Sequence, residues 1–182
     1  MDKADTASPP TLSLILGGMR SGKSRRAEDL VAASGLARVY LATAVAGDAE
    51  MEARIAAHRR RRGRDWRTVE VPLALPEAIL AESRPERILL VDCLTLWLTN
   101  LLMAKAEPAA AFERLAEALA ARRGPIVLVS NEVGLGVVPA DPLGRRFVDL
   151  AGDLHRRLAA LADRVELVVA GLPLVLKPKA TE

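Results

Sequence analysis

Apolar residues follow two patterns along the chain, and segments of one pattern alternate with segments of the other. Short continuous aliphatic runs are typical of strands that are covered on both faces of a parallel sheet. Such runs occur at residues 12–16, 37–43, 86–94, within 124–134, and at 164–171. Two weaker segments predict further strands: residues 66–71, where apolar and polar positions alternate, and residues 172–177, which predict an edge strand.

The segments between these runs favour helices. Apolar positions at helical spacing or runs of helix-forming residues predict helices at 23–34, 47–63, 75–83, 94–122 with a break near Glu107-Pro108, and 143–163. Strands and helices therefore alternate from end to end, without a repeat or a low-complexity linker. This order predicts an α/β fold with three layers and a mostly parallel sheet. We expect one domain over residues 12–182 and a flexible N-terminal tail over residues 1–11.

Composition narrows the class of protein. The chain has 182 residues, of which 51% are hydrophobic, so it is long enough to bury a core and is not disordered. Its apolar runs are interrupted well before the roughly 20 residues of a membrane helix, and the polar first residues lack the apolar segment of a signal peptide. Cys93, the single cysteine, excludes an internal disulfide framework and a cysteine-based metal cluster, and we expect it to be a small buried residue. These features predict a cytoplasmic enzyme that is not inserted in a membrane.

The segment after the first strand carries the strongest chemical signal. It reads GGMRSGKS and matches the phosphate-binding pattern G-x-x-x-x-G-K-[ST], between a predicted strand and a predicted helix. Glycines let the backbone turn its amides toward a phosphate, and the helix that follows adds its positive N-terminal end. The lysine would neutralise the β- and γ-phosphates and the serine would bind Mg²⁺. The predicted nucleotide-binding residues of this loop are Gly17, Gly18, Met19, Arg20, Ser21, Gly22, Lys23 and Ser24.

A second acid near the metal is expected in such a site. Asp92 follows four aliphatic residues at the carboxyl end of a predicted strand, where ligands gather in open parallel sheets. We therefore predict Asp92 and Ser24 as the Mg²⁺ ligands, and Asp92 as part of the nucleotide site. The alternative is that Asp92 only caps the next helix. A guanine-reading N-K-x-D signature is absent from the sequence, so a switch GTPase is a poor interpretation.

An arginine-rich run, HRRRRGR at residues 58–64, ends the second predicted helix. Its charge fits a nucleotide, a nucleic acid or only water, since charge runs usually form a solvated face. Aromatic residues for base stacking do not accompany the arginines, which disfavours nucleic acid as a partner.

Six segments, taken together, resemble one known family. They are GGMRSGKS, YLATA, DAEMEARIAAHRRRR with WRTVE, LLVDCLTLWLTNLL, VSNEVGLGVVP and ADRVELVVAGLPLVLK. The chain is similar to the bifunctional adenosylcobinamide kinase/adenosylcobinamide-phosphate guanylyltransferase family of cobalamin biosynthesis, over essentially its whole length after the tail. The resemblance implies that ATP or GTP phosphorylates the aminopropanol hydroxyl of adenosylcobinamide, and that GTP then gives GMP to this phosphate, releasing pyrophosphate. It also implies a homotrimer.

The same resemblance assigns roles to residues. The family passes GMP through a covalent histidine, and the histidine in the matching R-I-x-x-H pattern is His58, with Lys23 as the second catalytic residue. A neutral imidazole is a capable nucleophile at phosphorus, and neighbouring arginines favour its neutral form. The further nucleotide contacts implied are Arg59, Arg60, Arg61, Arg62, Ala42, Thr43, Ala44 and Glu70. His155 matches no motif position and is predicted to be a surface or helix-packing residue.

Some points stay open at the level of sequence. Met19 stands where the family commonly has alanine, which raises the question of whether the phosphate loop is crowded. The glycine-punctuated segment NEVGLGVVPADP, residues 131–142, follows a strand end and is expected to carry function, without a role for each residue. A general base for the acceptor hydroxyl is not evident. Two other classes remain: a small-molecule kinase without a covalent intermediate, and a non-enzymatic nucleotide-dependent switch or nucleic-acid-binding module.

Overall fold

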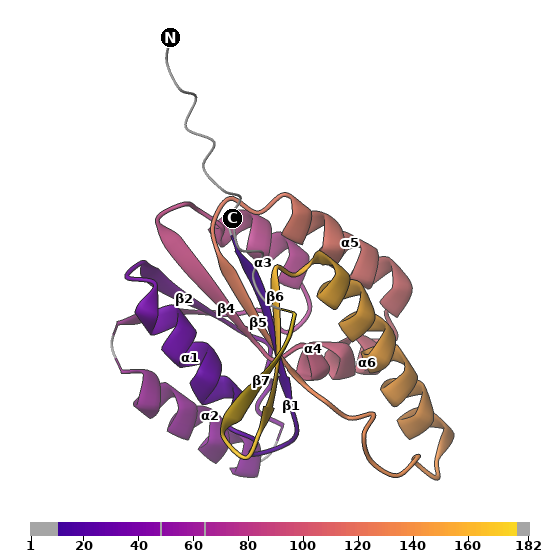
Figure 1. Ribbon diagram of the computed structural model, residues 1–182. Helices are drawn as coiled ribbons and strands as arrows, with labels where there is room; N and C mark the ends of the chain where they lie inside the picture. Colours follow the sequence, from indigo (N-terminus) through magenta and orange to yellow (C-terminus); the bar gives the residue numbers. More distant parts are fainter. Residues whose placement is uncertain (1–10, 48, 64, 178–182) are drawn as a thin grey trace.

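The computed structural model describes residues 11–47, 49–63 and 65–177, and these residues form a seven-stranded sheet (Figure 1). The strand order is β3-β2-β4-β5-β1-β6-β7. The strands are β1 (Leu12–Gly17), β2 (Ala37–Ala42), β3 (Trp66–Glu70), β4 (Arg87–Asp92), β5 (Ile126–Asn131), β6 (Arg164–Val169) and β7 (Leu172–Lys177). All neighbouring pairs are parallel except β6 and β7. The predicted α/β fold with a mostly parallel sheet is confirmed, including the edge strand at 172–177.

Helices cover both faces of the sheet and make three layers (Figure 1). They are α1 (Lys23–Ala33), α2 (Ala49–Arg62), α3 (Leu75–Glu82), α4 (Leu94–Met103), α5 (Pro108–Ala120) and α6 (Pro142–Leu161). Helices α1 and α2 lie on one face, and α3 to α6 lie on the other. The break predicted near Glu107-Pro108 separates α4 from α5, because proline is favoured in the first turn of a helix and not inside one. The expected tail at 1–11 lies almost wholly outside the described residues.

The core is aliphatic and divided by the sheet into two clusters. Successive residues of β1 show this division: Leu14 belongs to the cluster that contains the buried residues of α3 to α6, whereas Ile15 belongs to the cluster that contains Ala27 and Val31 of α1. Leu14 and Ile15 are both fully buried. This explains why the strand reads as a continuous apolar run and not as an alternating one, since both of its faces are covered. Within the described residues, no helix is long and apolar enough to span a membrane.

The parallel arrangement gathers several predicted residues at one edge of the sheet. Gly17 at the end of β1 is in register with Asn131 of β5, and Ala42 of β2 is in register with both Glu70 of β3 and Asp92 of β4. Carboxyl ends of parallel strands meet at the same edge, where open α/β sheets bind their ligands. The fold therefore brings together residues that are far apart in sequence: the paired residues Gly17 and Asn131 are 114 positions apart.

A buried ion pair fixes α1 to the sheet. Glu166 of β6 is fully buried, and its two carboxylate oxygens accept hydrogen bonds from Arg26 Nε (2.8 Å) and Arg26 Nη2 (2.9 Å). Arg164 Nε donates a further bond of 2.6 Å to the same carboxylate. The guanidinium of Arg26, and to a smaller extent that of Arg164, holds the pKa of Glu166 below its ordinary value despite burial. The carboxylate is therefore charged at neutral pH and holds the first turns of α1 in place.

The last two strands form a hairpin that returns to the sheet edge. Gly171 in the turn has a φ of 82°, which favours glycine. Its backbone amide donates a hydrogen bond of 2.8 Å to the carbonyl of Ser21, in the loop between β1 and α1. The side chains of β7 are exposed along its whole length, including the aliphatic residues Leu172, Leu174, Val175 and Leu176.

Candidate nucleotide-binding site

The loop between β1 and α1 has the geometry of a phosphate cradle. Arg20 and Gly22 have positive φ values of 58° and 96°, so the backbone turns sharply just before α1 begins at Lys23. The Lys23 side chain is 8% exposed, and its Nζ donates to the carbonyl of Gly18 at 3.1 Å. The ammonium is thus curled back over the loop, where a bound polyphosphate would lie beside the positive end of α1.

Glycine is required at the two ends of this loop. A Cβ atom at Gly17 would lie 2.4 Å from Ser21 Oγ and 2.7 Å from the carbonyl oxygen of Val168. At Gly22, a Cβ would approach the Cα of Gly171 to 3.2 Å, and the positive φ adds strain for any side chain. The pattern G-x-x-x-x-G is therefore a steric requirement of this fold as well as a phosphate-binding signature.

Met19 does not fill the cradle. Its side chain is 71% exposed and so extends toward solvent. The replacement of the alanine that is common at this place therefore leaves the space inside the loop unchanged. The question of crowding that the sequence raised is answered by this orientation.

Asp92 lies at the carboxyl end of β4 and does not cap a helix. The residue before α4 is Cys93, and no side chain among the described residues caps the first turn of α4. Burial raises the pKa of Tyr40 strongly, and the nearby Asp92 carboxylate raises it further. Asp92 is half-buried at the carboxyl edge of the sheet, two strands from the phosphate loop. The alternative interpretation as a helix cap is not supported.

Cys93 is buried, as predicted, at 5% exposure. Burial, followed by the Asp92 charge, raises the pKa of its thiol, so the thiolate form is disfavoured. A structural role explains this cysteine and a nucleophilic one does not.

Thr43 has a structural function that the sequence did not indicate. Its side chain is fully buried, and its hydroxyl donates to the carbonyl of Cys93 (2.7 Å) and accepts from the Cys93 amide (2.8 Å). Asn100 Nδ2 then donates to the carbonyls of Thr43 (2.8 Å) and Pro72 (2.9 Å). These bonds fix the ends of β2 and β4 relative to α4. Any contact of Thr43 with a nucleotide would have to come from its backbone.

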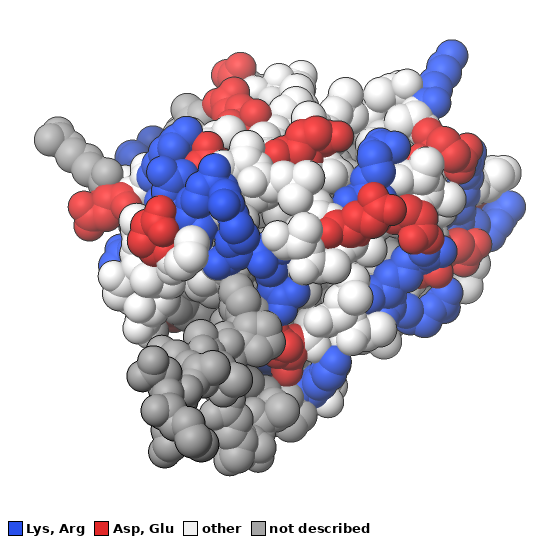
Figure 2. Space-filling view, turned by 90° about the horizontal axis from the view of Figure 1, so that it is seen from above, with Lys and Arg blue, Asp and Glu red and all other residues white. Residues whose placement is uncertain are grey.

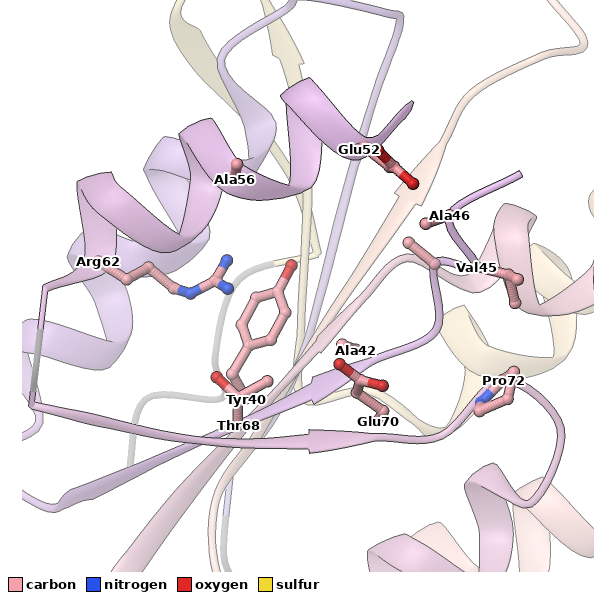
Figure 3. Close-up of a pocket in the computed structure, with 11 residues that line it drawn as sticks. Tyr40, Ala42, Val45, Ala46, Glu52, Ala56, Arg62, Thr68, Glu70 and Pro72 are labelled. Atoms are coloured by element: carbon pink, nitrogen blue, oxygen red, sulfur yellow. The ribbon is translucent and has the colours of Figure 1, made fainter. Parts of the chain in front are cut away.

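A cavity of about 430 Å³ lies between α2 and the edge of the sheet formed by β2 and β3 (Figure 3). Its wall is mostly apolar, and its polar side chains include Tyr40, Arg62, Glu52 and Glu70. The complete lining is Tyr40, Ala42, Ala44, Val45, Ala46, Glu52, Ala56, Arg62, Thr68, Glu70 and Pro72. Such a shape, with few polar groups on an apolar wall, suits the base and ribose of a nucleotide. Four of the predicted contacts, Ala42, Ala44, Arg62 and Glu70, are among these residues.

Arg62 and Tyr40 form the polar wall of this cavity. The guanidinium carbon of Arg62 lies 3.4 Å from the centre of the Tyr40 ring, within the range of a cation–π contact. The Nη1 atom of Arg62 is buried and has no hydrogen-bond partner among the described residues. A buried donor without a partner is unfavourable, by about 1–3 kcal/mol, and more for a charged group. The site therefore offers a donor that an oxygen atom of a ligand would satisfy.

The predicted nucleophile, His58, belongs to helix α2. His58, Arg59 and Arg61 lie in α2, but their side chains are outside the described part of the structure. Arg60 is exposed and Arg62 is half-buried, so these two arginines have different environments. On the face shown in Figure 2, acidic and basic side chains are interspersed and do not form a continuous basic surface.

Three residues in and around the site were missed by sequence reasoning. Tyr40 and Asn100 lie in an apolar strand and an apolar helix, and nothing in their local sequence distinguishes them from core residues. Glu132 was part of a loop to which no individual roles were given. Its backbone amide donates to the carbonyl of Gly17 at 3.0 Å, which places it beside the phosphate loop. Its position directly after a buried strand was the available signal.

The fold and the loop define the class of protein, a P-loop α/β protein that binds nucleotides. Two solved structures share the fold: flagellar accessory protein FlaH from Methanocaldococcus jannaschii (TM-score 0.53, 12% identity, 96% of this chain and 82% of that chain) and the RadB recombinase (TM-score 0.52, 15% identity, 88% and 74%). The family is shown by sequence. The profile of cobinamide kinase / cobinamide phosphate guanyltransferase matches residues 13–176, and the chain belongs to this family of bifunctional transferases.

The names of two relatives agree with this assignment. The bifunctional adenosylcobalamin biosynthesis protein CobP of Pseudomonas aeruginosa is 58% identical over 166 residues, which cover 90% of this chain and 96% of the relative. The bifunctional adenosylcobalamin biosynthesis protein CobU of Escherichia coli is 41% identical over 179 residues, covering 90% and 98%. The resemblance inferred from the sequence motifs is therefore confirmed.

Proposed function

We propose that this protein phosphorylates the aminopropanol hydroxyl of adenosylcobinamide with ATP or GTP, and then transfers GMP from GTP to that phosphate through a covalent intermediate on His58. The products of the second reaction are adenosylcobinamide-GDP and pyrophosphate. One observation carries the proposal from the geometry: a phosphate loop and an apolar cavity with a buried, unpartnered guanidinium nitrogen lie along the same edge of one sheet. Family membership supplies the identity of the acceptor.

The phosphate loop binds the triphosphate in this proposal. Backbone amides between Gly17 and Ser24 face the phosphate oxygens, and Lys23 gives up its bond to the Gly18 carbonyl to contact the β- and γ-phosphates. The residues present also fit Mg²⁺, which is commonly held by one or two protein oxygen ligands together with substrate phosphates. Ser24 in the first turn of α1 and Asp92 at the end of β4 would hold it. When bound, Mg²⁺ supplies charge neutralisation on the phosphates.

The transferase reaction proceeds by two displacements at the α-phosphorus. The neutral imidazole of His58 attacks, the bond to the bridging oxygen breaks, and pyrophosphate leaves with the electron pair. An oxygen of the cobinamide phosphate then attacks the phosphoramidate and releases the imidazole. Arg59 to Arg62 stabilise the negative charge on the nucleotide during both steps, with Arg62 held against Tyr40 for this purpose.

Assembly and location complete the proposal. The relatives' family and the exposed aliphatic side chains of β7 support a homotrimer, since a strand of this kind at a sheet edge is usually covered by a partner. We also expect a cytoplasmic location, since the relatives are proteins of adenosylcobalamin biosynthesis. The mass of the purified protein, measured by light scattering after size-exclusion chromatography, tests the trimer directly.

Labelled GTP tests the covalent intermediate. The purified protein is incubated with Mg²⁺ and GTP labelled at the α-phosphate, beside the variant His58→Ala, and the label on the protein is read from a gel. We expect an acid-labile, base-stable label on the parent protein and none on the variant. GTP labelled at the γ-phosphate is the control, because nucleotidyl transfer leaves it in pyrophosphate.

The rival function gives a different result in the same experiment. A P-loop kinase without a covalent intermediate binds GTP and phosphorylates a small acceptor, yet carries no α-label on either protein. An α-label that persists on His58→Ala would assign the intermediate to another residue and overturn the role of His58.

A further inference from the structure

The kinase half-reaction needs a group that accepts the proton of the attacking hydroxyl. We propose that Glu132 is this general base, and that His155 and the amide of Gly134 position its carboxylate. The inference rests on the proposed kinase activity and adds a catalytic residue to it. The evidence is the place of Glu132 in the sheet, the partners of its two carboxylate oxygens, and the environment of His155.

Glu132 lies nearer to the phosphate loop than the other acids at this edge of the sheet. It follows β5, which pairs directly with β1, and its amide donates to the Gly17 carbonyl at 3.0 Å. Neighbouring strands lie about 4.8 Å apart, so β5 is about 5 Å from β1, β4 with Asp92 about 10 Å, and β3 with Glu70 about 19 Å. Asp92 is assigned to the metal, and Glu70 lines the cavity under α2. Glu132 is the acid whose strand adjoins the loop that would hold the γ-phosphate.

The Glu132 carboxylate is held in place by a hydrogen bond, and no close ion pair neutralises it. One oxygen, Oε1, accepts a hydrogen bond of 2.6 Å from the Gly134 amide, which closes a tight turn around the side chain. The other, Oε2, lies 3.7 Å from Nδ1 of His155, longer than a hydrogen bond. The side chain is 22% exposed, so a substrate hydroxyl can reach it from the solvent side of the edge. The carboxylate therefore has one oxygen held by the Gly134 amide and one oxygen without a hydrogen bond among the described residues.

His155 is buried and neutral, which suits a residue that positions the Glu132 carboxylate. It is buried in α6 at 7% exposure, and its Nε2 lies 2.7 Å from the hydroxyl of the fully buried Ser130. Burial lowers the pKa of His155, and the Glu132 charge opposes this only in part. The imidazole is therefore neutral at neutral pH. When the Ser130 hydroxyl donates to Nε2, the ring hydrogen is on Nδ1 and faces Glu132, so the ring orients the carboxylate as a dipole and not as a cation.

The kinase reaction is a single displacement at the γ-phosphorus. The hydroxyl oxygen of the acceptor attacks the γ-phosphorus, and the bond from the γ-phosphorus to the β,γ-bridging oxygen breaks. The electron pair of that bond stays with the nucleoside diphosphate that leaves. The hydroxyl proton passes to the Glu132 carboxylate, which returns it to water before the next turnover. Transfer of GMP to an existing phosphate involves no hydroxyl proton and does not need this base.

The test uses this difference between the two half-reactions. Glu132→Gln keeps an oxygen that can accept from the Gly134 amide but removes the basic carboxylate. The kinase reaction is measured with ATP and adenosylcobinamide, and the transferase reaction with GTP and adenosylcobinamide phosphate supplied directly. We expect the kinase kcat to fall by about 100-fold or more, with the KM for ATP changed by less than about threefold and the transferase kcat similarly preserved.

Two further variants complete the design. Glu132→Asp keeps a carboxylate on a shorter side chain, so the kinase kcat should rank Glu above Asp and Asp above Gln. Glu86→Gln makes the same chemical change in an exposed residue next to the start of β4, at the opposite edge of the sheet, and is the matched control.

Three outcomes would overturn the proposal. Kinase activity of Glu132→Gln within about threefold of the parent would exclude a general base at this position. An equal loss of both half-reactions, with Glu132→Asp no better than Glu132→Gln, would show that the residue acts only on the structure of the loop. If the parent protein itself fails to phosphorylate adenosylcobinamide, the proposed function fails together with this inference, and the result is distinct from the other two.

Discussion

The guanidinium carbon of Arg62, at the last position of α2, lies 3.4 Å from the centre of the Tyr40 ring on β2. Tyr40 in turn packs edge-on against Trp66, with the ring centres 6.2 Å apart. The contact therefore joins the end of the arginine-rich helix to two adjacent strands. Because the Nη1 atom of Arg62 is buried without a partner among the described residues, the stacking holds a donor ready in the cavity wall.

Replacement of this arginine should weaken GTP binding selectively. We expect Arg62→Ala to raise the KM for GTP in the transferase reaction by about 10- to 100-fold, since both a cation–π contact and a charge-assisted hydrogen bond are lost. The measurement is steady-state kinetics with adenosylcobinamide phosphate at saturation. Arg114→Ala, which removes an exposed arginine from α5, is the control and should leave the KM unchanged. An unchanged KM in Arg62→Ala would show that the nucleotide does not use this cavity.

Gly17 should tolerate no side chain. A Cβ there would lie 2.7 Å from the carbonyl oxygen of Val168. This oxygen belongs to the backbone of the paired strand β6, so moving it would cost free energy. We expect Gly17→Ala to lower the free energy of unfolding by about 1–3 kcal/mol and to abolish detectable binding of a fluorescent nucleotide. Gly152→Ala in α6, where the added Cβ would meet nothing within 4 Å beyond its chain neighbours and the backbone of its own helix, should instead raise the stability by about 0.5–1 kcal/mol. Urea denaturation of both variants checks these values.

The buried carboxylate of Glu166 predicts a pH-dependent difference in stability. Its pKa is lowered in the folded state, chiefly by Arg26, from an ordinary value of 4.5. A lowered pKa means that the stabilisation is present above the unfolded value and is lost as the pH falls through the folded value. We expect Glu166→Gln to reduce the free energy of unfolding by about 2 kcal/mol at neutral pH, and the difference from the parent to shrink below about pH 4.

An exposed acid supplies the comparison for this experiment. Asp153 in α6 accepts bonds from Arg156 and Arg157, but all three side chains are substantially exposed. Asp153→Asn should therefore change stability less than Glu166→Gln does, because solvent screens exposed ion pairs. Denaturant titrations at several pH values measure the free energy of unfolding of both variants relative to the parent. A constant difference between the parent and Glu166→Gln across the acid range would contradict the role of the Glu166 charge.

The stereochemistry of the transferase reaction is predicted by its two displacements. Each in-line attack inverts the configuration at phosphorus, so passage through His58 gives net retention. GTP that carries a chiral α-thiophosphate reports the configuration in the adenosylcobinamide-GDP product. Inversion would indicate a single direct displacement, and the covalent histidine would then be off the reaction path.

The parts of the fold that were predictable are those that local sequence specifies. The run at 12–16 is apolar at nearly every position because both faces of β1 are covered, and the glycines at 17 and 22 are imposed by close backbone contacts. The break at Pro108 follows from the missing amide of proline. Each of these signals can be read from a short stretch of sequence, although the contacts that require the two glycines come from Val168 and Gly171, far along the chain.

The parts that were missed depend on which strands become neighbours. Glu132 acquires its place beside Gly17 only because β5 inserts between β4 and β1, an order that no local pattern encodes. Arg62 and Tyr40 are 22 positions apart in sequence, and their contact likewise requires α2 to lie over β2. His155 was expected at the surface or in helix packing, and its bond to Ser130 of β5 shows packing against the sheet.

The hydrogen bond from the Gly171 amide to the Ser21 carbonyl has a consequence for the order of events during synthesis. The turn between β6 and β7 is among the last described parts of the chain to leave the ribosome, yet it braces the loop that is among the first. A nascent chain that lacks this turn has its phosphate loop open on one side. Nucleotide binding should therefore begin only after the hairpin of β6 and β7 has been synthesised and has paired with β1.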